Sequence, residues 1–134
     1  MIERSKSDRL TKAYNLKADS DINYYDRGTI YAKNGQYQLA IDNLNKAIVL
    51  NHYHIIAYSN RGIVYFQMGI YQRALEDFNE AIRLKSDYAD AYNNRASIYL
   101  KQGDNISGCR DAQKACELGN CKLLEAANTS GLCR

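Results

Sequence analysis

The sequence lacks any long apolar run. No stretch reaches the roughly 18 uninterrupted apolar residues of a membrane span. The first twenty residues also lack the apolar segment of a signal peptide, because charged side chains such as Glu3, Lys6 and Arg9 interrupt them. We therefore expect no membrane insertion. The N-terminus as it stands carries no export signal.

The sequence also has little excess charge of either sign. Its 18 Lys and Arg residues stand against 15 Asp and Glu residues, which gives a net charge of +3 with the two signs interspersed. Phosphate binding usually needs a denser basic patch, so nucleic acid is not an expected partner. With 134 residues and 46% hydrophobic content, the chain is expected to form a single folded domain spanning 1–134.

Signals of enzymatic chemistry are scarce as well. His52 and His54 flank Tyr53 at a spacing that could contact a metal, but no third ligand is evident nearby, and a polar loop is the favoured interpretation. No glycine-rich phosphate loop follows a strand, and no Ser-His-Asp or Cys-His set is suggested. We predict that the protein is not an enzyme and has no cofactor, metal site or catalytic residue.

What the sequence has is a period of thirty-four residues. The period divides it into units at 21–54, 55–88 and 89–122. Residues of the same or similar type recur at equivalent positions of the three units: Tyr24, Tyr58 and Tyr92; Arg27, Arg61 and Arg95; Gly28, Gly62 and Ala96; Tyr31, Tyr65 and Tyr99; Gly35, Gly69 and Gly103; Ala47, Ala81 and Ala115. Such a period predicts stacked supersecondary units.

Each unit reads as two amphipathic helices. Tyr24, Gly28 and Tyr31 are spaced four and three apart, which is the spacing of one helical face. The glycine at 35, and its equivalents in the other units, falls between the two periodic runs, where a left-handed helix cap would require it. Short loops make the paired helices antiparallel, and small residues let them approach closely. The predicted fold class is all-α.

These residues resemble the tetratricopeptide repeat (TPR) family. The second unit matches the signature best, with every one of these residues at the expected offset: Tyr58, Gly62, Tyr65, Gly69, Tyr71, Ala74, Phe78 and Ala81. The resemblance covers about 102 of the 134 residues. It implies a right-handed α-solenoid of antiparallel helix pairs, built from three TPR units.

The sequence departs from the family pattern in three ways. Proline is absent, arginine replaces the usual leucine at Arg27, Arg61 and Arg95, and the third unit has Gly108 and Ala112 where alanine and a large apolar residue are usual. The last departure suggests a looser final hairpin. The arginine pattern, YxNRGxxY, resembles a common bacterial subtype. We expect these arginines to pair with acids of the second helix such as Asp77 or Asp111.

Both flanks of the array are expected to be helical. Residues 7–18 read as the second helix of a preceding repeat, so the chain could be part of a longer TPR protein, or as an N-terminal capping helix. Self-association through this half repeat is a further expectation. Residues 121–128 read as a C-terminal capping helix.

All four cysteines fall near the C-terminus. If 106–118 and 121–128 form an antiparallel hairpin, Cys116 and Cys121 meet at its closed end, and Cys109 and Cys133 at its open end, where the tail would have to fold back. The alternatives are four reduced thiols or a zinc site. Bridges need an oxidising compartment, so localisation is expected to be periplasmic or exported if the cysteines are bridged and the N-terminus is truncated. It is expected to be cytoplasmic if Met1 is the native start.

The TPR resemblance implies a concave groove, lined by the first helix of each unit, that holds a peptide or helix. The residues expected to line it mix apolar and polar types: Tyr25, Thr29, Ile56, Asn60, Ile63, Phe66, Gln67, Asn93, Asn94, Ser97 and Lys101. Packing against adjacent helices is the alternative for Ile56 and Phe66. The repeats that capture acidic chaperone tails use a clamp of lysines, an arginine and asparagines. Only Asn60 matches this clamp, so such tails are not expected partners.

The sequence thus predicts a noncatalytic scaffold or adaptor that binds a protein or peptide of unknown identity in its groove. Two alternatives remain open. One is a secretion or assembly chaperone that holds a client segment. The other is an accessory domain that positions substrates for a larger enzyme.

Overall fold

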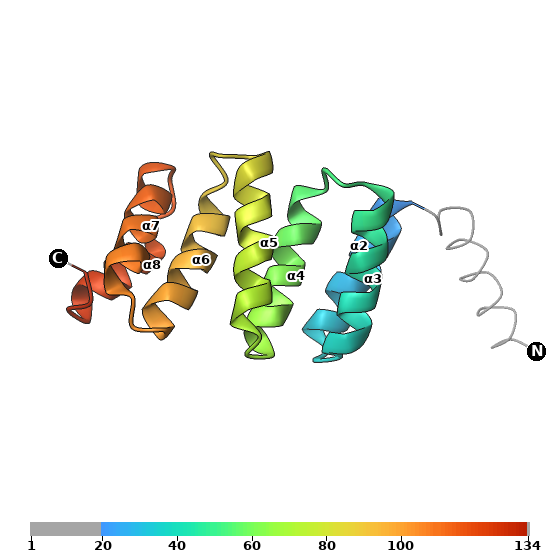
Figure 1. Cartoon of the computed structure of the whole chain (residues 1–134), viewed down its shortest axis with the longest axis horizontal. Helices are drawn as coiled ribbons and strands as arrows, with labels where there is room; N and C mark the ends of the chain where they lie inside the picture. The colour runs from blue at the N-terminus through green and yellow to red at the C-terminus, as the bar shows by residue number, and fades with distance from the viewer. Residues whose placement is uncertain (1–19, 134) are drawn as a thin grey trace, which may run out of the picture. The chain divides into compact units, whose positions relative to one another are not determined.

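A computed structural model describes residues 20–133, which form seven α-helices and no strand (Figure 1). In chain order the helices are α2 (Asp21–Lys33), α3 (Tyr37–Leu50), α4 (Ile55–Gln67), α5 (Tyr71–Leu84), α6 (Ala89–Lys101), α7 (Asn105–Glu117) and α8 (Lys122–Thr129). The predicted all-α fold of antiparallel helix pairs is confirmed. The helix expected at 7–18, and self-association through it, lie outside the described residues. None of the described helices has the length and apolar character of a membrane span.

Contacts divide the chain into two compact units, Met1–Ala57 and Tyr58–Arg134. In the first unit α2 packs against α3. In the second, α5 contacts α6, α6 contacts α7, and α7 contacts α8. The part of α4 that lies in this second unit packs against α5, because Phe78 and Ala74 of α5 form a buried cluster with partly buried side chains of α4.

The turn inside each helix pair depends on a glycine in the left-handed conformation. Gly69 has φ +78°, and the next residue, Ile70, donates its N–H to the carbonyl of Tyr65 at 2.8 Å. A bond that reaches back over the end of the helix in this way closes a Schellman motif. Gly35 and Gly103 repeat this conformation with φ of +76° and +83°. The glycine caps predicted from the sequence are confirmed.

In the first two pairs, the helix crossing depends on a glycine of the first helix that faces a larger side chain of the second. A Cβ added at Gly62 would lie only 2.7 Å from Cε1 of Phe78, whose side chain is 1% exposed. Gly28 stands in the same relation to Leu44, whose Cγ would lie 2.8 Å away. Only glycine lets these helix axes approach so closely without displacing the larger side chain.

The third pair uses different residues. Ala96 and Ala112 are both fully buried. A Cβ at Gly108 would lie 2.6 Å from Cδ2 of Leu100, so Leu100 occupies the space beside this glycine. The looser hairpin expected from Gly108 and Ala112 stays a prediction.

We expect this complementarity to be measurable in a double-mutant cycle. Gly62→Ala should destabilise the fold by about 1–3 kcal/mol through overpacking, and Phe78→Ala by about 3–5 kcal/mol through a cavity. The double variant recreates the Ala96 and Ala112 arrangement, so its loss in urea unfolding should fall at least 1 kcal/mol short of the sum. Strict additivity would contradict the packing argument.

Two arginine–aspartate pairs join the helices of the second unit. Arg61 donates from Nε and Nη2 to the two carboxylate oxygens of Asp77 at 2.9 and 2.6 Å. Arg95 holds Asp111 in the same way, at 2.7 and 2.8 Å. The carboxylate side chains are only 4% and 7% exposed. Both predicted pairings are confirmed, and Asn43 stands at the equivalent position of the first pair.

Burial dominates the electrostatics of the Arg61–Asp77 pair. It raises the pKa of the Asp77 carboxyl, although the bidentate hydrogen bonds from Arg61 oppose that rise. In the other pair, hydrogen bonding to Asp111 raises the pKa of Arg95. A buried carboxylate of this kind is tolerable only while its arginine is present, and the arginine likewise needs its acid.

Removing one member of the pair should therefore leave the other as an uncompensated buried charge. We expect Asp77→Ala to lower the free energy of unfolding by about 3 kcal/mol, the lower end of the range for a broken buried pair, since Arg61 is 21% exposed on its side chain. The double variant Arg61→Ala and Asp77→Ala should lose less than the two single losses combined. Asp42→Ala, which removes an exposed acid, serves as the control and should change stability by less than about 0.5 kcal/mol.

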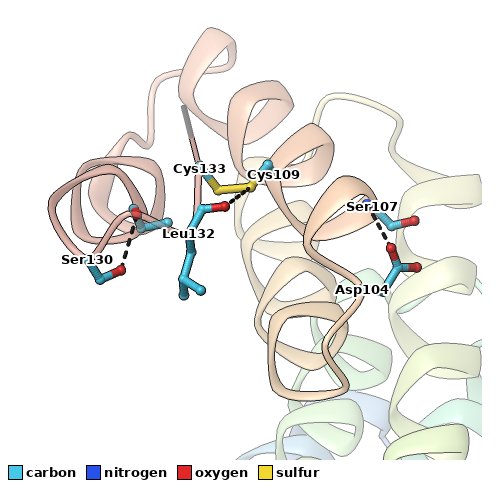
Figure 2. The surroundings of a disulfide bond; sticks show 7 residues. Asp104, Ser107, Cys109, Ser130, Leu132 and Cys133 are labelled. Atoms are coloured by element: carbon cyan, nitrogen blue, oxygen red, sulfur yellow. Dashed lines mark hydrogen bonds between the residues drawn. A yellow bond between two sulfur atoms is a disulfide. The ribbon is translucent and has the colours of Figure 1, made fainter.

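The last helix is held by two disulfide bridges, Cys109–Cys133 and Cys116–Cys121. Figure 2 shows the first of them, with the Leu132 carbonyl oxygen 3.3 Å from the Cys109 sulfur. Leu132 donates its N–H back to the carbonyl of Ala127, so the tail folds back onto α8. The predicted pairing and the returning tail are both confirmed, and the structure has bridges where free thiols or a zinc site were the alternatives.

The two bridges should contribute unequally to stability. Cys109–Cys133 closes a loop with a sequence separation of 24, against 5 for Cys116–Cys121. In the chain-entropy model these loops correspond to about 3.5 and about 2 kcal/mol. Paired Cys→Ser variants should therefore be destabilised in that order in urea melts, and peptide mapping under non-reducing conditions should recover these two linkages. The reverse order, or a different connectivity, would refute this assignment.

Candidate functional site

A pocket of about 240 Å³ opens between α4 and α6 in the second unit. Its lining comes from these two helices and from the loops before α6 and after α7: Ser59, Asn60, Ile63, Tyr88, Asp90, Asn93, Asn94 and Asn120. Four residues predicted to bind a partner, Asn60, Ile63, Asn93 and Asn94, therefore share one pocket. Its character is polar, with four asparagines and a single charged side chain, Asp90.

Hydrogen bonds hold one wall of this pocket in place. Asn120 donates from Nδ2 to Oδ1 of Asp90 at 3.0 Å, and Asn93 donates from Nδ2 to the backbone carbonyl of Asn120 at 3.4 Å. The loop after α7 is thereby tied to α6. The remaining oxygen of Asn93, Oδ1, is shielded from solvent and has no hydrogen-bond partner among the described residues. An amide oxygen in that state is costly, which makes it a strong acceptor for any donor that reaches it.

Three consecutive residues of α4, Asn60, Arg61 and Gly62, point in different directions and make different contacts. Asn60 lines the pocket, Arg61 pairs with Asp77 on α5, and Gly62 lies against a side chain of α5 at the crossing. Successive side chains of a helix point about 100° apart, so one short motif can serve the core and the surface together. Asn94 lines the same pocket one period later.

The other predicted residues of the second unit lie further along the same helices. Phe66 is half-buried, contacts the Tyr71 ring at a tilt of 42° with 5.5 Å between ring centroids, and packs against the buried cluster. Phe66 therefore packs against an adjacent helix, which was the alternative to lining the groove. Lys101 places its ammonium 6.0 Å from the centre of the Phe66 ring. Ser97 donates to the carbonyl of Asn93, and Gln67 is exposed.

Three predicted residues belong to the first unit and are not part of this pocket. Tyr25 stacks on His54 with ring centroids 5.0 Å apart, and Thr29 donates its hydroxyl to the carbonyl of Tyr25 at 2.9 Å. Ile56 is 47% exposed. Their role in partner binding stays a prediction.

His54, in the first interrepeat loop, has a local structural role. His54 accepts the N–H of Ala57 on Nδ1 at 3.1 Å, which caps the start of α4, and its Nε2 lies 3.8 Å from Asp21. Within residues 20–133, no three His, Cys, Asp or Glu side chains gather as a metal site would need.

Four lining residues, Ser59, Tyr88, Asp90 and Asn120, lie outside the set predicted from the sequence. Tyr88 and Asn120 lie in loops, where the period carries no helical pattern. A signal for Asn120 did exist, because Asn51 donates to Asp21 at 2.9 Å and the pair Asn120–Asp90 has the same separation of thirty residues. Asp90 and Asn120 each stand one residue later in the third repeat than Asp21 and Asn51 do in the first. This shift hides the correspondence between the two pairs.

Comparison with protein families gives matches over most of the array. A model described as TPR repeat matches residues 28–69 and 65–103, and one described as tetratricopeptide repeat matches residues 89–118. A search of curated protein sequences found no match.

Solved structures of similar fold include three informative cases. A crystal structure of MamA is 31% identical, with a TM-score of 0.75, and the match covers 81% of this chain and 64% of MamA. This chain thus spans less than two thirds of that relative. The first TPR of Spaghetti (RPAP3), bound to the HSP90 peptide SRMEEVD, is 24% identical, with a TM-score of 0.77 and coverage of 82% and 89%. The Arabidopsis OM64 TPR domain is 21% identical, with a TM-score of 0.79 and coverage of 83% and 93%. The last two likenesses are likenesses of fold alone.

Proposed function

Because the chain belongs to the tetratricopeptide repeat family, whose domains are generally noncatalytic protein-interaction modules, we propose that it binds a peptide segment of a partner protein in the pocket between α4 and α6. The observation that carries this proposal is the convergence of four asparagines on one pocket. A scaffold or adaptor role follows, with binding and no chemical step.

Asparagine suits the recognition of a peptide main chain. Its side-chain amide offers two donor hydrogens and an acceptor oxygen, which match the carbonyl and N–H groups of an extended segment. Asn60 and Asn94 stand one period apart, so they can contact successive groups of the same segment. Each such hydrogen bond is worth about 0.5–1.5 kcal/mol net.

Apolar contact can supply the remaining affinity. Ile63 lines the pocket, and Phe66 and Lys101 continue the same surface along α4 and α6. A few well-packed anchors usually dominate the affinity of a peptide, with the polar contacts fixing its direction.

We also assign the chain to the bacterial-type subtype with the pattern YxNRGxxY. Asn60-Arg61-Gly62 follows this pattern in the second repeat, and each member has a distinct contact there. The third repeat keeps Asn94 and Arg95 but has Ala96 in place of glycine.

Selection of peptides from a displayed random library, followed by affinity measurement on the full chain, tests the proposed function. The double variant Asn60→Ala and Asn94→Ala should weaken the selected peptides about tenfold or more, since two hydrogen bonds of about 0.7 kcal/mol each amount to one factor of ten. Gln72→Ala, an exposed change on α5, is the control and should leave affinity within twofold. Peptides whose affinity ignores the asparagine pair would contradict this assignment.

A further inference from the structure

The chemistry of the pocket between α4 and α6 narrows the kind of peptide it can hold. Resting on the proposed function, we propose that this pocket receives an arginine side chain of the bound peptide. The geometry points to a guanidinium group held between the carboxylate of Asp90, the amide oxygen of Asn93 and the ring of Tyr88.

The charge of the pocket favours a cationic ligand over an anionic one. Asp90 is the only charged side chain among the lining residues, so the pocket carries a negative charge. A carboxylate ligand would meet Asp90 and find no lining cation to oppose it. A cationic ligand gains from the same charge, although Asp90 is exposed and its attraction is partly screened by solvent.

Basic residues of neighbouring elements are engaged elsewhere. Arg61 and Arg95 are each bound to a buried aspartate of the second helix. Lys85 pairs with Asp87 at 2.7 Å in the loop before α6. Lys122, exposed at the start of α8, is close in sequence to Asn120 but is not part of the lining. The negative charge of Asp90 therefore has no counterion within the pocket.

The pocket also supplies hydrogen-bond acceptors. Asn93 lines the pocket, its Nδ2 is directed to the Asn120 carbonyl, and its Oδ1, shielded from solvent in the free chain, lacks a hydrogen-bond partner among the described residues. Asp90 accepts one hydrogen bond, from Asn120, and a carboxylate has capacity for several. A ligand rich in N–H donors binds Asp90 directly, and it satisfies Asn93 Oδ1 once the amide turns toward the pocket.

Arginine fits these features better than lysine. Its guanidinium is planar, carries five donors in a fixed fork and stacks on aromatic faces, so it can reach Asp90 and Asn93 while lying on Tyr88. A cavity of about 150 Å³ is known to hold benzene, so 240 Å³ has room for a planar group of that size. The peptide SRMEEVD bound to the first TPR of Spaghetti (RPAP3) is rich in acids. We expect this chain to prefer the opposite charge.

The experiment combines a peptide change with a pocket change. Peptides are selected by the full chain from a random displayed library, and arginine in the selected sequences is replaced by citrulline, its neutral isostere. Dissociation constants are measured by fluorescence anisotropy on the wild type, on Asp90→Asn and on Asp42→Asn. Asp90→Asn keeps the size of the side chain, and Asp42→Asn removes an exposed acid of α3 as the matched control.

The selected peptides are expected to share an arginine. Citrulline should weaken binding at least fivefold on the wild type and on Asp42→Asn, but less than twofold on Asp90→Asn. Lysine in place of arginine should bind several-fold more weakly. Circular dichroism and urea unfolding of each variant confirm that the fold is retained.

Other outcomes separate the two proposals. Peptides that depend on Asn60 and Asn94 but lack arginine, or end in acidic residues, would overturn the arginine assignment and leave the groove assignment standing. Equal losses from citrulline on wild type and Asp90→Asn would do the same, as would lysine binding as tightly as arginine. If the double variant Asn60→Ala and Asn94→Ala binds every selected peptide as tightly as the wild type does, the groove assignment and the arginine assignment are both overturned.

Discussion

The close approach of the two helices within each pair is the constraint on which the rest of the structure depends. It requires glycine or alanine on the first helix, a side chain of matching size on the second, and a left-handed glycine between them. Gly62 and Phe78 are sixteen residues apart in the sequence. Arg61 and Asp77 have the same separation, so the crossing that brings the first two together also brings the second two together. The separation recurs in Arg95–Asp111. Asn60, one residue earlier, is then turned into the pocket. The proposed binding surface is in this sense a consequence of how the core packs.

Much of the fold could be predicted from the sequence because the period expresses this constraint directly. Positions that must be small, aromatic or cationic in one pair must be so in the next. The helix pairs, the glycine turns and the arginine–aspartate pairs all follow from register. The two disulfides followed from a different argument, since cysteines at the ends of two short antiparallel helices can meet in only a few ways.

The candidate site was predictable only in part, because its specificity lies where the period fails. Asn60, Ile63, Asn93 and Asn94 were accessible to reasoning from helical faces. Tyr88 was not, since it lies in a loop without a helical pattern. Asn120 was hidden because its hydrogen bond with Asp90 is shifted by one residue from the period. Packing of Phe66 was also undecidable, because an apolar residue at the edge of a helical face has the same spacing whether it contacts the core or a ligand.

The bridge between Cys109 and Cys133 has a mechanical consequence. Tension applied at the C-terminal end of the chain passes through the sulfur atoms to the start of α7, so α8 and most of α7 carry no load. A pulling force applied beyond Cys133 would meet this covalent link in place of a fraying helix. The first packing to resist that force would be that of α7 against α6. In an oxidising environment Cys133 is thus tied to the first turns of α7, and reduction would return the force to α8.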